Sequence, residues 1–212
     1  MSNACYPPAD EIAKAVGEFN SKFSCGEKQL WDSAQDAWKS LQSSRPDTAP
    51  LKTFVWTVKS KGSIQGVTPS DNDEVSKTLL SMKGELTKLK QKAFDPAQAN
   101  RPVDLVQRLV DGMFDATKSE HYAWASKILH WLLPNHIPIY DSLVREKLKI
   151  GCVRRQAYRL IAQWEYDCAR LLEPHEQQVV GQQEPKTLLR ALDKYLWWEE
   201  KAVQKRRRRS TP

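Results

Sequence analysis

The sequence has little cysteine and little glycine, and neither residue occurs in the spacing that builds a common cofactor or phosphate site. Its four cysteines, Cys5, Cys25, Cys152 and Cys168, form no Cys-x-x-Cys pair, which argues against a zinc or iron–sulfur site. Scattered thiols of this kind are typical of a reducing compartment, so we expect a cytoplasmic protein. The eight glycines form no phosphate-binding loop.

Long apolar runs are absent as well. Residues 1–11 lack the basic stretch and apolar run of a secretory signal. The densest apolar stretch, Ile128–Leu133, is far shorter than the roughly 20 residues that cross a bilayer. The sequence therefore predicts a soluble chain with no membrane partner.

Metal-binding and catalytic motifs are missing too. The four histidines share no ligand spacing, and Pro134 breaks any helical alignment of the closest two, His130 and His136. No nucleophile elbow or paired acid motif is present. We expect neither a bound metal nor another cofactor.

Excess positive charge is confined mainly to the end of the chain. The formal net charge is +7, but six positive charges and no acidic residue lie after position 200, which leaves +1 for residues 1–200. Consecutive arginines repel one another, and Ser210–Pro212 offers no apolar anchor. Residues 205–212 are therefore predicted to form a disordered basic tail that suits an anionic partner.

Apolar residues recur at steps of three and four along almost the whole chain, which is the period of an amphipathic helix. These stripes predict helices around residues 8–23, 30–41, 75–89, 105–113, 122–133, 141–148, 152–172 and 185–205. Pro96 and Pro102 bracket a predicted linker, and residues 53–58 fit a short helix or an extended segment equally. With no alternating strands, the predicted fold is all-α, a single compact multi-helix domain over residues 1–204.

The segment Tyr122–Asp141 holds the two best candidates for chemistry. Lys127 is the only formally charged side chain of the apolar helix 122–133. Apolar surroundings would lower the pKa of its amine and make it a nucleophile, or its stem lies along the helix while the ammonium reaches water. Asp141 precedes a helix, where it is either a structural N-cap or a carboxylate kept ionised by the helix start for catalysis.

The order of these residues resembles the helix-hairpin-helix DNA glycosylase superfamily, in particular its 8-oxoguanine glycosylase-like branch, over about residues 115–150. Ser126-Lys127 matches the lysine early in that family's second hairpin helix, 134–138 matches its proline-containing turn, and Ile139-Tyr140-Asp141 matches its aspartate. The Gly-rich hairpin of the family is replaced here by residues 118–121. An inactive descendant of the family would show the same pattern.

The resemblance implies a helix-hairpin-helix glycosylase-like fold and a base-excision activity on DNA, with a lysine Schiff-base lyase mechanism. Lys127 would attack the sugar C1′, and Asp141 would stabilise the developing positive charge. The extruded base would stack on Trp124 or Trp131, and Ser126 would belong to the same substrate site.

Basic residues follow Asp141 closely. Seven of them, against three acidic residues, lie between positions 145 and 170, and Arg145, Arg154 and Arg155 are the predicted phosphate contacts among them. A solvated helix face would carry similar charges. Two hypotheses follow from the sequence. The chain is either a DNA-binding glycosylase-like enzyme or its inactive descendant, or it is a non-enzymatic helical interaction protein whose basic tail binds an anionic partner.

Overall fold

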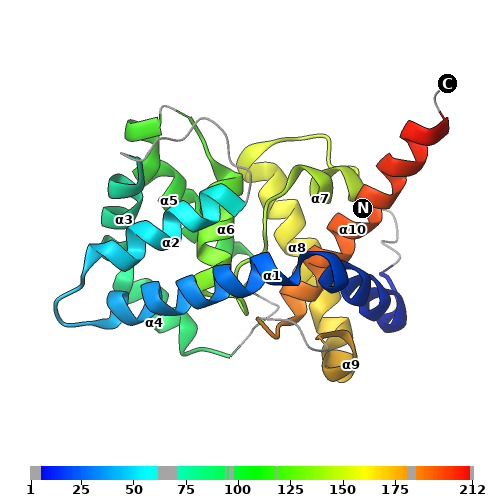
Figure 1. The fold of residues 1–212 in the computed structure, drawn as a ribbon, viewed down its shortest axis with the longest axis horizontal. Coiled ribbons are helices and arrows are strands. Elements are labelled where there is room, and N and C mark those ends of the chain that lie inside the picture. Colours follow the sequence, from blue (N-terminus) through cyan, green and yellow to red (C-terminus); the bar gives the residue numbers. More distant parts are fainter. Residues whose placement is uncertain are drawn as a thin grey trace.

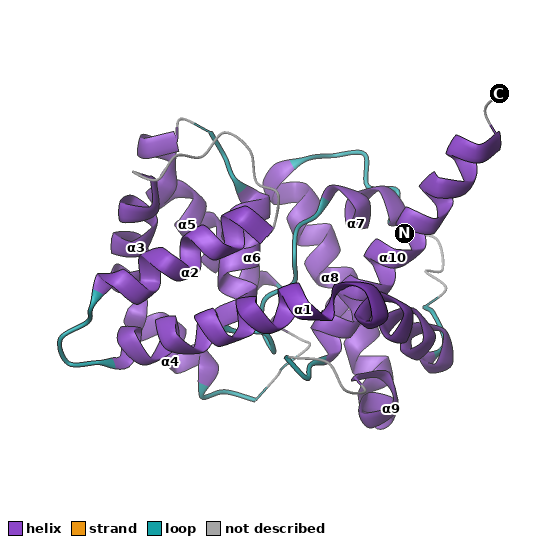
Figure 2. Ribbon diagram, in the orientation of Figure 1, coloured by secondary structure: helices purple, strands orange, loops and turns teal. Residues whose placement is uncertain are grey.

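The computed structural model describes residues 6–61, 71–93, 95, 98–117, 119–180 and 185–210. All regular structure in these ranges is helical (Figure 2), so the prediction of an all-α fold is confirmed. The α-helices are α1 (Ala9–Gln42), α2 (Thr48–Lys61), α3 (Asp71–Ser81), α4 (Lys83–Lys90), α5 (Asn100–Thr117), α6 (Tyr122–Leu132), α7 (Ser142–Lys147), α8 (Arg154–Leu172), α9 (Glu176–Val180) and α10 (Leu188–Ser210), and the 3-10 helix η2 (Glu173–His175) precedes α9.

The helices form two groups that lie side by side, with α1 crossing both (Figure 1). One hydrophobic core contains apolar side chains of α2 to α6 and of the second half of α1. The other contains those of α8 to α10 and of the first half of α1. Because α1 and α8 contribute to both cores, the two groups make one compact domain.

The long helix α1 replaces two predicted helices. The expected interruption between residues 23 and 30 contains Gly26, and a helical glycine costs only about 1 kcal/mol. Burial of Ile12 and Val16 on one side and of Leu41 on the other contributes roughly 1.5–3 kcal/mol for each side chain. This burial outweighs the glycine, so the helix runs unbroken to Gln42.

Two ambiguous regions are settled by the structure. Residues 53–58 are helical, because Leu51, Phe54, Val55 and Val58 point one face of α2 into the core. The predicted linker is shorter than expected: Pro96 lies outside the described residues, and Pro102 falls in the first turn of α5, where a missing backbone N–H costs little.

The end of the chain differs from the predicted disordered tail. The helix α10 continues through Lys205 to Ser210 and projects from the body as a free-standing helical end (Figure 1). Arginine and lysine are good helix formers, and extending a helix that is already docked avoids the unfavourable nucleation step. Thr211 and Pro212 lie outside the described residues. Within the described ranges, none of the helices combines the length and apolar character needed to span a bilayer.

Candidate functional site

The extended segment between α6 and α7 is held in place by side chains of α6 and α8. The contacts are Tyr166 Oη to His136 O (2.6 Å), His130 Nδ1 to Ile137 O (2.6 Å), Tyr158 Oη to Pro138 O (3.0 Å) and Tyr140 N to Ser126 Oγ (2.9 Å). Buried backbone polar groups need partners, and this segment has no neighbouring strand to supply them. The four contacts therefore fix the path of the chain that leads to Asp141.

Asp141 uses its two carboxylate oxygens for different partners. Oδ1 accepts the backbone N–H of Leu143 at 3.0 Å, which makes Asp141 the N-cap of α7. Oδ2 lies 3.0 Å from Nζ of Lys127 on α6, and both side chains are 17% exposed. The structure thus brings Lys127 and Asp141 together, as the joint role implied by the resemblance requires, and the N-cap interpretation of Asp141 is confirmed.

The ion pair lies on the wall of a cavity of about 740 Å³ between the two groups of helices. Aromatic rings of α1, α6 and α10 form much of its wall: Phe19, Phe23, Trp131 and Trp197. Its cationic side chains are Lys22, Lys61, Lys127, Arg190 and Lys201, and its carboxylates are Glu27, Asp141 and Asp193. The volume falls within the range of small-molecule sites, which typically combine apolar walls with a few polar groups.

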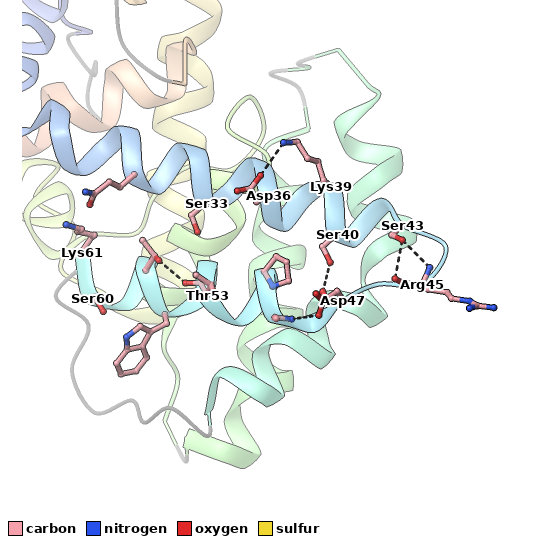
Figure 3. A pocket seen from close by; sticks show the side chains of 15 residues that line it. Ser33, Asp36, Lys39, Ser40, Ser43, Arg45, Asp47, Thr53, Ser60 and Lys61 are labelled. Atoms are coloured by element: carbon pink, nitrogen blue, oxygen red, sulfur yellow. Dashed lines mark hydrogen bonds and ion pairs between the residues drawn. The ribbon is translucent and has the colours of Figure 1, made fainter.

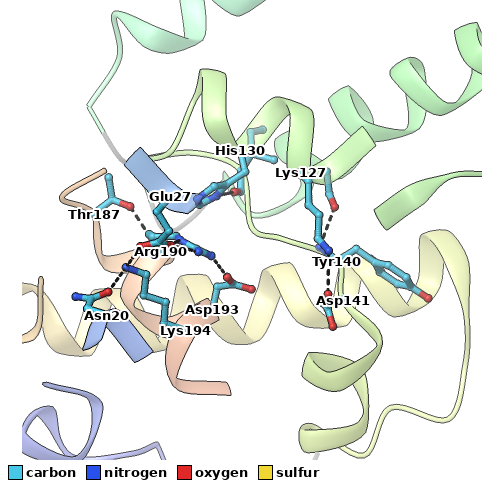
Figure 4. A network of polar contacts seen from close by, with 12 residues as sticks. Asn20, Glu27, Lys127, His130, Tyr140, Asp141, Thr187, Arg190, Asp193 and Lys194 are labelled. Carbon is cyan, nitrogen blue, oxygen red and sulfur yellow. Dashed lines mark hydrogen bonds and ion pairs between the residues drawn. The ribbon is translucent and has the colours of Figure 1, made fainter. Parts of the chain in front are cut away.

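Opposite the ion pair lies a buried charge network that links α1 to α10 (Figure 4). The Arg190 guanidinium donates to the carboxylates of Glu27 and Asp193. Nζ of Lys194 donates to Oε2 of Glu27 at 2.6 Å and to Oδ1 of Asn20 at 2.6 Å. Two positive and two negative side chains thus neutralise one another in a region that water barely reaches.

Burial changes the proton affinity of this network. It raises the pKa of Asp193 to about 6, against the opposing effect of the Arg190 guanidinium. It also lowers the pKa of Lys194 to about 8, with added repulsion from Arg190. A carboxyl group with a pKa close to neutrality can both give and take a proton. Asp193 lines the cavity and is therefore the group best suited to proton transfer there.

Only one contact of the charge network could be predicted from the sequence. Arg190 and Asp193 are three residues apart on one helix, a spacing that brings two side chains together. Their third partner, Glu27, is 163 residues from Arg190 in the chain, and no local pattern reveals such a contact.

The two predicted tryptophans of α6 have different surroundings. Trp131 faces the cavity, and the Arg190 guanidinium lies 5.4 Å from its ring centre. Trp124 is fully buried in the first core and does not line the cavity, so it cannot stack on a bound base as expected. The two rings share one stripe of α6 but lie two turns, roughly 10 Å, apart along the helix axis, and the cavity reaches Lys127 and Trp131 but not Trp124. Ser126 is also fully buried, where its Oγ positions Tyr140.

The predicted basic cluster is partly neutralised, because carboxylates from distant parts of the chain pair with its members. Arg154 pairs with Glu120 at 2.9 Å, and Arg155 pairs with Asp104 at 3.0 Å. Lys147 likewise lies 3.4 Å from Glu199, and Arg145 lies 3.5 Å from the Tyr140 hydroxyl. Neither Arg145, Arg154 nor Arg155 lines the cavity. Apart from Lys127, the cations around the cavity are instead residues of α1, α2 and α10 that the sequence did not indicate as site residues.

The structure describes only part of residues 118–121, which stand in the place of the Gly-rich hairpin of the resembling family. Lys118 lies outside the described residues, Glu120 pairs with Arg154, and His121 precedes the first turn of α6. Among the described residues, no group of three or more His, Cys, Asp or Glu side chains is placed to hold a metal ion.

No protein-family model matches the chain, and comparisons with curated proteins and with solved structures also found no match. The chemistry of the site therefore rests on its own geometry.

Proposed function

We propose that this protein is a DNA glycosylase-like enzyme that removes a base from a nucleotide held in the aromatic cavity, with Lys127 as the nucleophile. The observation that carries the proposal is the ion pair of Lys127 and Asp141, 3.0 Å apart, on the wall of a cavity with four aromatic rings. An amine, a carboxylate and stacking surfaces are the groups that such a reaction requires.

The aromatic walls supply a binding surface for a flat ring. The Trp197 ring lies edge to face with those of Phe19 and Phe23, with ring centres 5.5 Å apart, and the two phenylalanine rings are tilted toward each other with centres 5.0 Å apart. Trp131 lies on the α6 side of the same cavity. A base taken out of a stack loses π-contacts, and rings in a cavity restore them. The ordered cluster also limits the side-chain entropy lost on binding.

In the proposed reaction Lys127 first passes a proton to Asp141, and its Nζ lone pair then forms a bond to the sugar C1′. The bond from C1′ to the base nitrogen breaks, and the base leaves with the bonding electron pair. The base then receives a proton from the new C1′–Nζ ammonium, a transfer that Asp193 can relay. Finally the C1′–O4′ bond breaks as C1′=Nζ forms, and O4′ takes the proton that Asp141 held, which restores the carboxylate.

The projecting end of α10 supports a nucleic acid as the partner. Lys205 and Arg206–Arg208 are exposed there, and Lys201, one turn before them, lines the cavity. A nucleic acid whose phosphates bind along α10 would therefore extend directly to the proposed site. Deletion of residues 205–212 should weaken DNA binding and flatten its salt dependence by nearly one unit of log–log slope for each lost phosphate contact.

Borohydride trapping tests the proposed activity, because it reduces the imine to a stable amine. A panel of oligonucleotides with single damaged bases or an abasic site should give a covalent adduct with the wild-type protein. Lys127→Ala should abolish the adduct, and Asp141→Asn should slow its formation on the order of 100-fold, which is typical of a lost general base. Lys22→Ala is the matched control, since this lysine lines the same cavity, and it should leave trapping intact.

An adduct that survives Lys127→Ala would refute the assignment of the nucleophile. No adduct and no released base across the panel would refute the activity. The non-enzymatic hypothesis would then hold, with the Lys127–Asp141 pair as a structural clamp between α6 and α7.

A further inference from the structure

A second hollow, an open groove of about 1060 Å³, runs between α1 and α2 (Figure 3). Hydroxyl groups of both helices and of the turn between them line it: Ser33, Ser40, Ser43, Thr53, Thr57 and Ser60. The exposed ring of Trp56 also borders it.

The groove continues the cavity along one face of α1. Lys22 and Gly26 line the cavity, and Gln29, Ser33 and Asp36 line the groove. These positions follow one another at steps of three and four, which places them on a single helix face. On α2, Lys61 lines both hollows. A polymer with one unit in the cavity would therefore meet the groove next.

The side chains that line the groove carry a net charge of +1, from Lys39, Arg45 and Lys61 against Asp36 and Asp47. The Asp36 carboxylate is already paired with Lys39 at 3.2 Å, and Asp47 accepts the backbone N–H of Ala49 at 2.9 Å. Among the described residues only Asp36 is thus paired with a cation, and the hydrogen bond leaves the charge of Asp47 in place. Arg45 lies at one end of the groove and Lys61 at the other, where the cavity begins (Figure 3).

We propose that this groove binds single-stranded nucleic acid that flanks the nucleotide in the cavity, an inference that rests on the function proposed above. Serine and threonine hydroxyls, arginine and lysine are the side chains that contact phosphates and sugars. The Trp56 ring, 37% exposed with Nζ of Lys59 4.5 Å from its centre, offers a surface on which an unpaired base stacks. A paired base is already stacked within its duplex, so Trp56 selects a single strand.

The length of the groove agrees with such a ligand. From Gln29 to Ser43, the part of α1 and its C-cap that line the groove rise about 21 Å, at 1.5 Å per residue. This span holds on the order of four nucleotides, the lower end of the site sizes known for single-strand-binding domains.

Fluorescence anisotropy of labelled oligothymidylates tests the proposal in the Lys127→Ala background, where no turnover occurs. An eight-nucleotide strand should bind more tightly than a dinucleotide. Trp56→Ala should weaken binding of the longer strand at least fivefold, since loss of one stacking contact costs about 1–3 kcal/mol. Arg45→Ala should reduce the slope of log affinity against log salt by about 0.7.

Two control variants match these changes outside the groove. Phe114→Ala removes another exposed aromatic ring, and Arg170→Ala removes another exposed arginine; neither residue lines the groove, and neither change should alter binding. Circular dichroism confirms that each variant is folded.

Equal affinity of Trp56→Ala and its parent would overturn the groove proposal, and so would a parent protein that binds no single strand. These failures are distinct from failure of the enzyme. Loss of trapping with intact Trp56-dependent binding would refute catalysis alone, whereas intact trapping with Trp56-independent binding would refute the groove alone.

Discussion

The pH dependence of the free energy of unfolding should report on His130, whose ring binds the extended segment that ends at Asp141. Its Nδ1–H donates to the carbonyl of Ile137, and its Nε2 has no partner among the described residues. Burial, together with the nearby charges of Arg190 and Lys194, lowers the pKa of His130 to about 3. We consider His130→Gln, which keeps a side-chain donor but removes the titrating group.

The magnitude follows from the difference between the two pKa values. The pKa in the folded protein lies below the ordinary value of 6.5, so the associated stability is fully present above pH 6.5 and is lost as the pH falls toward 3. At pH 4.5 the unfolded chain binds the proton and the folded protein does not. Each pH unit below 6.5 costs 1.36 kcal/mol, which gives a loss of about 2.7 kcal/mol at pH 4.5.

Urea denaturation at pH 7 and pH 4.5 measures this loss in both proteins. The unfolding free energy of the wild type should fall by about 2.5 kcal/mol more than that of His130→Gln. Contributions from other groups, Asp193 included, are common to both proteins and cancel in the comparison. Equal pH dependence in the two proteins would refute the assignment of His130 as a buried neutral imidazole.

Two further predictions concern packing and buried charge. Gly112→Ala should destabilise the protein by about 1–3 kcal/mol, because the added Cβ would lie 2.5 Å from the Thr78 methyl group. The matched change Gly17→Ala places its Cβ in open space and should stabilise the protein by up to about 1 kcal/mol. Thermal denaturation of both variants measures the two effects. Glu27→Gln should lower the free energy of unfolding by about 3–5 kcal/mol, because it leaves buried cations without their carboxylate. Asp32→Asn breaks an exposed ion pair and should lower it by under about 1 kcal/mol. Chemical denaturation measures both.

The sequence is most informative where structure depends on neighbours in the chain. The apolar period predicted α6 and α8, and the cap pattern at Asp141 predicted the start of α7. The proximity of Lys127 to Asp141 followed from two helices joined by a short proline turn.

Contacts between distant segments could not be predicted in this way. The carbonyl of Pro138 is bound by Tyr158 of α8, and Arg155 is neutralised by Asp104 of α5. Neither contact can be inferred from the residues nearby in the sequence. The burial of Trp124 depended on which helices cover the first turns of α6, which only the assembled fold determines.

Mass spectrometry of the borohydride-trapped protein tests the central claim most directly, because it identifies the lysine that carries the sugar. Four lysines line the cavity: Lys22, Lys61, Lys127 and Lys201. If Lys127 is the nucleophile, the tryptic peptide that contains it should carry the reduced adduct, with a missed cleavage at Lys127, and the peptides of the other three should be unmodified. An adduct on any of those three, or no adduct with any damaged or abasic oligonucleotide, would contradict the proposed site.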